Sequence, residues 1–319
     1  MVARHQAHRA GALALAVLAD SLDARILIAL DTGSTGIGDL RTAVGVPPPT
    51  TLRGHLRALE KLGLLARRRA EVFPGRTEVG LLESGRGLLR VAERVAGWLA
   101  ARPGASVALG TPTSHAVLVA LADGWSSLLV RALAAAPLSL VQLDRLIGSL
   151  DYPTLSRRVD ALKVTGLVRA CGSTDRATPY APTDWLARAV GPLISAACWE
   201  LESGVKAAPI GAVEVEAALL LGGPRIRAAA SVSGSCRLVV RMGDRGAAGG
   251  VVRVDRGRVV SVTIDLRQFA SAAISAGTAT WMSALLDGDG RGLAVSGNQR
   301  LALPLAESMT AALEGPRRR

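Results

Sequence analysis

The sequence predicts a mostly helical protein in which one helix, turn, helix and β-hairpin unit occurs twice and is followed by an α+β domain. Apolar residues in 50–69 recur at three- and four-residue spacing, which indicates one buried helix face. The same pattern returns 103 positions later, in 153–172, which indicates a duplicated domain. After residue 209 the pattern changes to alternating apolar and polar residues, which is typical of strands.

Size and composition exclude a disordered chain and favour a polyanionic partner. The chain has 319 residues, of which 49% are hydrophobic, and this is enough for two or three domains with cores of their own. Its formal net charge is +12 at pH 7, which favours nucleic acid or an anionic membrane surface as a partner. The high content of Ala, Gly and Arg is typical of a GC-rich bacterial genome.

The expected domain boundaries follow the repeat and two Pro- and Gly-containing breaks. In chain order they are a first unit at 1–102, a linker at 103–113, a second unit at 114–202, a linker at 203–209, and an α+β domain at 210–316.

The first unit is expected to consist of helices around a core, with one hairpin. The expected helices are Ser21–Leu30, Gly38–Val44, a helix from Thr50 to Gly63, and Leu88–Ala101. The tight break Gly45-Val46-Pro47 separates the second helix from the third. Gly63 is placed to end the third helix, as a C-terminal glycine does, and an arginine-bearing extended run follows it.

The second unit repeats this order. Its expected helices are Val117–Leu133, which includes Trp125, then Leu140–Leu146, a helix from Pro153 to Gly166, and Trp185–Trp199. Gly166 corresponds to Gly63 of the first unit.

The residues that carry a family resemblance lie at the end of each repeated helix. They are LRALEKLGLL (56–65) and VDALKVTGLV (159–168), with Tyr180-Ala181-Pro182-Thr183 after the second hairpin. Both units resemble winged helix-turn-helix domains, specifically those of the HxlR group of bacterial regulators, which is close to MarR-type proteins. After the first hairpin, Val79–Gly85 keeps only the spacing and the closing glycine of this pattern, so the first copy departs further from the family.

The resemblance implies that the second helix of each helix-turn-helix enters the major groove of DNA. The implied DNA-binding residues on these helices and their wings are Thr50, Thr51, Arg53, Arg57, Arg67, Arg68, Arg69, Arg76, Thr154, Ser156, Arg157, Arg158, Arg169 and Arg176. Arginine on such a helix can bind guanine, and wing arginines can contact phosphates. The alternative is that these arginines are the solvated face of a surface helix, and the leucines of the buried line are structural in either case.

The two exposed faces differ, since Arg57 aligns with Asp160, Arg53 with Ser156 and His55 with Arg158. The sequence therefore predicts an asymmetric DNA site. A single chain with two reading heads would act as a pseudo-dimer, and a homodimer is the alternative.

The last domain is expected to combine a small sheet with helices. The expected elements are a helix at Val213–Leu221, strands at Ser235–Arg241, Val251–Asp255 and Arg258–Ile264, a helix at Thr278–Leu286, an extended piece at Gly292–Ser296, and a helix at Gln299–Leu313. A turn is expected at Arg256-Gly257. The closing run from residue 278 resembles the sterol-carrier-type (SCP2-like) lipid-binding fold.

That resemblance implies a pocket for a hydrophobic small molecule. The side chains expected to line it are Trp281, Met282, Leu285 and Leu286. Their spacing is equally typical of an ordinary helix core, so a plain core remains the alternative.

Catalysis, cofactors and metals are not expected. Cys171, Cys198 and Cys236 are isolated and lack zinc-site spacing, which fits a reducing cytoplasm. No phosphate-binding loop or nucleophile set is present, and Asp287–Gly290 is interpreted as a turn because it lacks a calcium-loop ligand series.

No membrane association is expected either. The apolar run Gly11–Ala19 is similar to a signal peptide, but its helical pattern continues through Asp20, Asp23 and Arg25, which favours one or two amphipathic helices. The longest uncharged run, Pro103–Ala122, contains two prolines and several small polar residues, which argue against a membrane span.

The resulting prediction is a cytoplasmic, non-enzymatic transcription regulator that binds double-stranded DNA with two winged helices and responds to a hydrophobic effector. The alternative is a carrier or sequestering protein whose winged helices mediate protein interactions.

Overall fold

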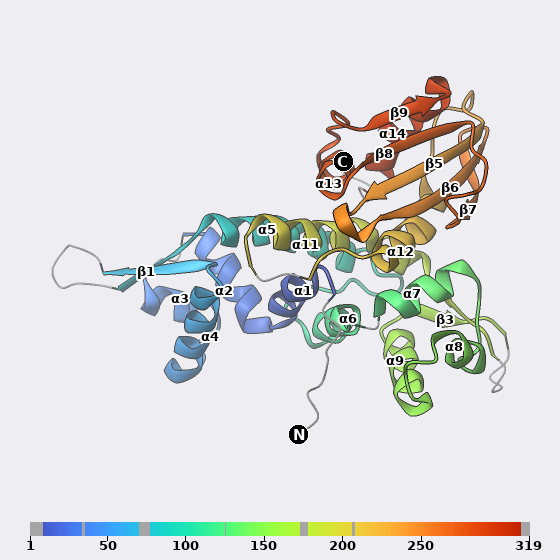
Figure 1. Ribbon diagram of the computed structural model, residues 1–319. Coiled ribbons are helices and arrows are strands. Elements are labelled where there is room, and N and C mark those ends of the chain that lie inside the picture. The colour runs from blue at the N-terminus through green and yellow to red at the C-terminus, as the bar shows by residue number, and fades with distance from the viewer. Residues whose placement is uncertain are drawn as a thin grey trace. The chain divides into compact units, whose positions relative to one another are not determined.

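The computed structural model describes residues 9–33, 36–69, 77–124, 126–172, 178–205 and 208–313 (Figure 1). The chain divides into two compact units. The N-terminal unit comprises Gly11–Ala122 and Ala196–Ala207, and the C-terminal unit comprises Met1–Ala10, Asp123–Ser195 and Ala208–Arg319.

The N-terminal unit is built from helices and one hairpin. In order it contains α1 (Ala12–Ala19), α2 (Ser21–Asp31), α3 (Ile37–Ala43), α4 (Pro49–Lys61), β1 (Leu65–Arg69), β2 (Thr77–Leu81), α5 (Glu83–Ala100) and α6 (Pro112–Ala122). The opening segment forms two helices, which agrees with the predicted one or two. They separate at Asp20, whose carboxylate accepts hydrogen bonds from the N–H groups of Leu22 and Asp23 and so caps α2.

A buried carboxylate caps α1 in the same way, although it lies far along the chain. Glu200, on the part of α11 (Val190–Glu202) that belongs to this unit, is only 2% exposed. Its Oε2 accepts a hydrogen bond from the N–H of Gly11 at 2.8 Å, and its Oε1 accepts from the N–H groups of Leu13 and Ala14. One negative charge therefore satisfies N–H groups that the first turn of a helix leaves unpaired.

The helical part of the C-terminal unit repeats the order of α2 to α5. It contains α7 (Ser126–Ala135), α8 (Leu140–Ile147), α9 (Tyr152–Val164), β3 (Val168–Ala170), β4 (Tyr180–Pro182), α10 (Asp184–Ala187) and the beginning of α11.

Two predicted helices are each divided in two. The expected Val117–Leu133 is interrupted after Ala122, and the break includes Asp123 and Gly124, two residue types with low helix propensity. Trp125 lies outside the described residues. The expected Trp185–Trp199 is divided between α10 and α11, and Pro192 lies in the first turn of α11, where proline is tolerated.

Among the described residues, no single helix is long and apolar enough to cross a membrane. The bent pair formed by α6 and α7 passes the same test of length and composition, but only when its two helices are taken together.

The rest of the C-terminal unit is a mixed sheet with helices. Its elements are α12 (Ala212–Gly222), η1 (Gly223–Arg225), β5 (Gly234–Arg241), η2 (Gly243–Arg245), β6 (Ala247–Asp255), β7 (Arg258–Thr263), β8 (Ala272–Gly277), α13 (Thr278–Asp287), β9 (Ala294–Gly297) and α14 (Gln299–Leu313). The strand order is β7-β6-β5-β8-β9, in which β5 and β8 are parallel and the other pairs are antiparallel. The predicted turn at Arg256-Gly257 joins β6 to β7, and both residues have positive φ.

One face of this sheet carries its core. Cys236, Val252 and Ile274 from three neighbouring strands belong to a buried cluster that includes Trp281 of α13 and Leu305 of α14. Alternation along the strands places the intervening side chains on the opposite face. There the strand register puts Ser235, Arg253 and Ser261 opposite one another across β5, β6 and β7.

Candidate nucleic-acid interface

Helix α4 has one apolar face against the N-terminal unit and one polar face toward solvent. Leu52, Leu56 and Leu59 are each no more than 1% exposed. Gly63 ends the helix with a φ of 70°, and the N–H of Leu64 donates to the carbonyl of Leu59. This confirms the predicted glycine cap, which turns the chain directly into β1.

Helix α9 is constructed in the same way at the positions predicted by the repeat. Leu155, Val159 and Leu162 are buried. Gly166 has a φ of 81°, and the N–H of Leu167 donates to the carbonyl of Leu162 at 2.9 Å. The two helices therefore share both a buried face and a C-terminal cap.

After each hairpin, the chain forms a backbone hydrogen bond with the residue that follows the helix-ending glycine. In the first copy the N–H of Leu82 donates to the carbonyl of Leu64 at 3.0 Å, and in the second the N–H of Thr183 donates to the carbonyl of Leu167 at 3.0 Å. Hydroxyl groups make the adjacent contact, since Ser84 donates to the carbonyl of Gly63 and Thr183 to that of Gly166. The Val79–Gly85 element, which keeps only the spacing and the closing glycine of the family pattern, thus makes the same connection as Tyr180–Thr183.

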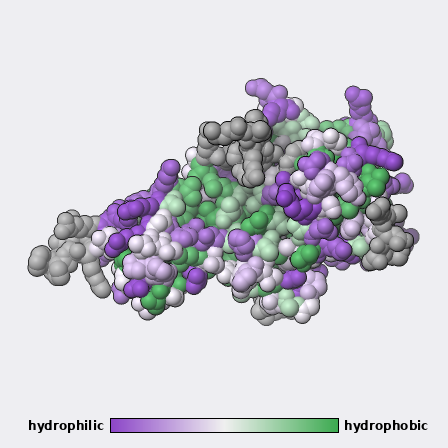
Figure 2. Space-filling view, turned by 90° about the horizontal axis from the view of Figure 1, so that it is seen from below, coloured by the Kyte–Doolittle hydropathy of each residue, from purple (hydrophilic) through white to green (hydrophobic). Residues whose placement is uncertain are grey.

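The residues predicted to face DNA on α4 are all exposed: Thr50, Thr51, Arg53 and Arg57. On α9, Arg157 is exposed, whereas Thr154 and Ser156 are half-buried. Asp151 caps α9 by accepting the N–H of Thr154 at 2.9 Å, and these hydrogen bonds lower the pKa of its carboxyl group. In Figure 2, hydrophilic residues predominate over the region of the N-terminal unit that holds α3 and α4.

The predicted wing residues are in different situations. Arg67 on β1 donates from Nε to Glu60 at 2.9 Å, and this contact lowers the pKa of the Glu60 carboxyl group. Arg68 and Arg169 are exposed. The backbone of Arg69 pairs with Thr77 in the hairpin, while Arg76 and Arg176 lie outside the described residues.

Arg158 differs from the other predicted DNA contacts. Its guanidinium forms an ion pair with the carboxylate of Asp123, just before α7, and its side chain is 22% exposed. Burial lowers the pKa of this guanidinium, which nevertheless stays protonated at neutral pH. Arg158 is thus directed at α7, inside the C-terminal unit, and we leave it out of the proposed DNA-facing set.

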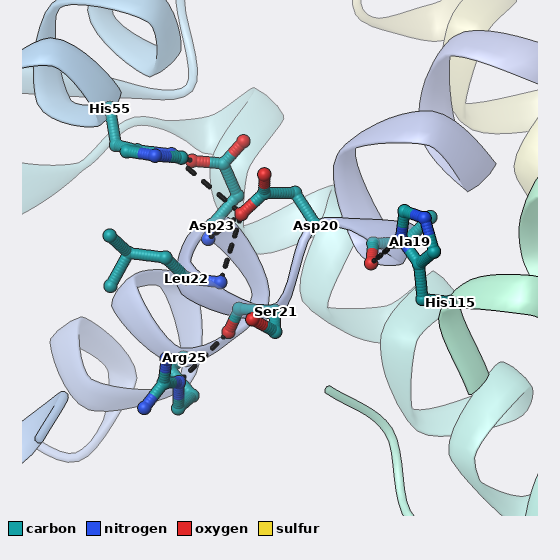
Figure 3. Close-up of polar contacts among 8 residues, drawn as sticks. All are labelled: Ala19, Asp20, Ser21, Leu22, Asp23, Arg25, His55 and His115. Carbon is teal, nitrogen blue, oxygen red and sulfur yellow. Dashed lines mark hydrogen bonds and ion pairs between the residues drawn. The ribbon is translucent and has the colours of Figure 1, made fainter. Parts of the chain in front are cut away.

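His55 is the corresponding residue of α4, and sequence reasoning assigned it no role. Its Nδ1 lies 2.7 Å from Oδ1 of Asp23 and 3.7 Å from Oδ1 of Asp20, both at the beginning of α2 (Figure 3). The pKa of Asp23 is raised, first because the carboxyl group is buried and despite its hydrogen bond to His55. The signal that could have revealed this contact is the 103-residue offset, which aligns His55 with Arg158 and Asp20 with Asp123.

The three donor atoms of Asp20, Asp23 and His55 lie within 4.8 Å of one another, which is the spacing of a metal site. Each already has a protein partner, because Oδ1 of Asp20 accepts two backbone N–H groups and Nδ1 of His55 hydrogen-bonds to Asp23. We therefore interpret the group as a hydrogen-bonded contact between helices and assign no metal to it.

The residues expected to line a hydrophobic pocket are packed into the core of the sheet domain. Trp281, Met282 and Leu286 are buried, and Leu285 packs against the same core. The indole N–H of Trp281 donates to the carbonyl of Val239 at 2.8 Å. A hollow of about 370 Å³ lies on the other face of the sheet, where Ser235, Arg253 and Phe269 are among its lining residues and none of the four predicted residues takes part.

Comparison with known protein families gives a match for the first copy. Residues 17–104 match the model of the HxlR-like helix-turn-helix family, and this segment contains α2 to α5 with the β1–β2 hairpin. The match supports a helix-turn-helix transcriptional regulator, and such a family implies DNA binding. A comparison with curated proteins found no match.

Proposed function

We propose that the chain is a transcriptional regulator that reads duplex DNA with α4 and with α9. The observation that carries this proposal is the family match over residues 17–104, together with the exposed Arg53 and Arg57 on the helix that such a domain inserts into the major groove. Buried leucines hold the opposite face of α4 in the core, so the two arginines point away from it.

The extension to α9 rests on the internal repeat. The second copy shares the buried face, the glycine cap and the return of the chain after the hairpin. Its exposed face is less basic, because Asp160 stands where α4 has Arg57. We therefore propose an asymmetric DNA site in which the first copy contributes more phosphate attraction.

Both reading helices belong to one polypeptide, so a single chain can supply the two heads that a dimer of one-domain regulators supplies. Such heads bind half-sites about one helical turn apart, or a multiple of it. We propose that the chain acts as a monomeric pseudo-dimer in the cytoplasm, with homodimerisation as the alternative.

The C-terminal α+β domain is proposed as a sterol-carrier-like effector domain, supported by its order of helix, strands, helix, short strand and helix. The placement of Trp281 in the core gives a hydrophobic pocket little support. The hollow beside Arg253 instead favours a polar effector. Such an effector would raise the melting temperature of the wild-type protein and not that of an Arg253→Ala variant.

The test of DNA reading is a double substitution, Arg53→Ala with Arg157→Ala, measured on genomic fragments that the wild-type protein selects. Loss of one good arginine–base contact in each head weakens specific binding by about 1–3 kcal/mol per contact. We expect specific binding to collapse while the circular dichroism spectrum and melting temperature stay unchanged.

The matched control removes the same charge elsewhere, with Arg267→Ala and Arg300→Ala, two exposed arginines of the sheet domain. It should retain specific binding with at most a small general loss. Equal losses of DNA affinity in the control and the test variant would mean that only net charge matters. That result would contradict a role of α4 and α9 in reading the DNA sequence.

A further inference from the structure

We propose that His55 and Arg158 are equivalent positioning residues that hold the two reading helices in place, and that only the first of these contacts depends on pH. The inference rests on the proposed DNA-binding function. It assigns α4 a contact made by an imidazole, a group that can be charged or neutral at physiological pH, and assigns α9 a contact made by a guanidinium, which stays charged.

The equivalence is visible in sequence and in structure. His55 and Arg158 are separated by the offset of the repeat, and so are Asp20 and Asp123. Each cation lies on a reading helix, and each carboxylate lies at the beginning of the helix that opens its copy, α2 or α7. In the first copy the shorter contact of His55 is to Asp23 at 2.7 Å, and Asp20 lies 3.7 Å away, whereas in the second copy Arg158 pairs with Asp123. The two copies thus share a polar contact between corresponding parts of the fold, although their exposed faces differ.

In the first copy, two carboxylates lie next to the ring of His55. Asp20 is fixed as the cap of α2, and Asp23 follows one turn later with its side chain 15% exposed. The ring of His55 is 27% exposed and meets both carboxylates through Nδ1 (Figure 3). Arg53 and Arg57 lie on the same helix as His55, so a contact that fixes the position of α4 also fixes where both arginines are presented.

The second copy makes the link with a different cation. Arg158 pairs with Asp123, and position 126, which corresponds to Asp23, is a buried serine. A guanidinium is protonated at every physiological pH, whereas an ordinary imidazole changes charge near pH 6.5. Below that range a histidine can form an ion pair with carboxylates. Above that pH range, a neutral imidazole can still donate a hydrogen bond to a carboxylate, but the ion pair is lost.

The other charged groups near this contact are occupied. Arg25, also on α2, donates to the carbonyls of Ser21 and Val44, and Figure 3 shows it directed away from His55. Arg67 on β1 is paired with Glu60 near the far end of α4. Among the residues that the structure describes, the charged partners of the His55 ring are thus the carboxylates of Asp20 and Asp23.

The experiment exchanges the two cations. His55→Arg gives the first copy a permanent charge, Arg158→His gives the second a titratable one, and His115→Gln serves as a histidine control elsewhere in the N-terminal unit. DNA affinity is measured from pH 6 to pH 8 at fixed ionic strength with a metal chelator present. Melting temperatures are recorded without DNA over the same range.

Wild-type affinity should fall about two- to fivefold between pH 6 and pH 8, which is the size expected for losing one partly exposed ion pair. His55→Arg should remove this dependence and His115→Gln should keep it, while Arg158→His should increase it. A pH dependence as large in His55→Arg as in the wild type would overturn the proposal, since the titrating group would then lie elsewhere.

The melting data separate failure of this inference from failure of the proposed function. If the wild-type protein binds no DNA at any pH, the proposed function fails. The positioning role is then judged by the melting temperature of His55→Arg relative to wild type. A difference that grows from pH 6 to pH 8 supports the contact, and a constant difference overturns it.

Discussion

At the scale of single residues, carboxylates determine where several helices begin. Asp20 caps α2, Asp151 caps α9, and Glu200 caps α1 from a distant part of the chain. The first two were within reach of sequence reasoning, because a cap and its helix are neighbours. Glu200 was not, since its partners are 186–189 residues away and no local pattern links them.

The cap at Glu200 leads to a prediction on stability. Glu200→Gln replaces a carboxylate that accepts three backbone N–H groups with an amide that has only one acceptor oxygen. Leaving buried N–H groups without an acceptor should cost about 1–3 kcal/mol, seen as a lower urea midpoint. The exposed neighbour Glu202, changed to Gln, should change the free energy of unfolding by less than about 0.5 kcal/mol. Equal midpoints for both variants would show that Glu200 is not a stabilising cap.

A second residue-scale prediction concerns thiol reactivity. Burial raises the pKa of Cys236 to about 12, whereas Cys171 and Cys198 are half-buried. At pH 8 its thiolate fraction should be roughly a thousandfold below that of an ordinary cysteine. A disulfide reagent should therefore label Cys236 only after unfolding, and Cys236→Ser should leave the native labelling amplitude unchanged. Loss of native labelling in that variant would contradict the burial of this thiol.

Residue roles were harder to predict than residue positions. The exposed positions of Arg53, Arg57 and Arg157 agree with the helical spacing, because spacing alone decides which face of a helix is buried. Arg158 is adjacent to this face. It pairs with Asp123 through a tertiary contact, which the spacing of residues along a helix cannot predict. The role of Trp281 could not be predicted either, because residues of a helix core and residues that line a pocket have the same periodicity.

At the scale of elements, prediction succeeded where a local signal was present. The glycine caps of α4 and α9, the turn between β6 and β7, and the last helix, Gln299–Leu313, all fall where the sequence indicated. Strand β8 (Ala272–Gly277) was missed, because its small residues give no alternation strong enough to predict a strand. Its place in the sheet comes from parallel pairing with β5, which is a long-range contact.

Helix α5 allows an internal comparison between two glycines. A Cβ atom at Gly85 would lie 2.1 Å from the carbonyl oxygen of Leu64, whereas one at Gly97 would meet nothing within 4 Å. Gly85→Ala should therefore destabilise the fold by about 1–3 kcal/mol, because backbone must move. Gly97→Ala should stabilise it by about 0.5–1 kcal/mol through helix propensity. Calorimetric melting gives both values, and a tolerated Gly85→Ala would contradict the close approach of α5 to the chain after α4.

At the scale of the whole molecule, the repeat is what the sequence predicted most clearly, since it depends on a pattern that occurs twice. The structure adds tertiary contacts that the pattern does not show, among them those of His55 with Asp23 and of Arg158 with Asp123.

The central proposal is that one chain carries two reading heads, and hydroxyl-radical footprinting on a selected DNA fragment tests it most directly. The wild-type protein should protect two segments whose centres are about one helical turn, or a multiple of it, apart. Arg53→Ala should lose protection in one segment and Arg157→Ala in the other. A single protected segment, or the same segment lost in both variants, would contradict the account.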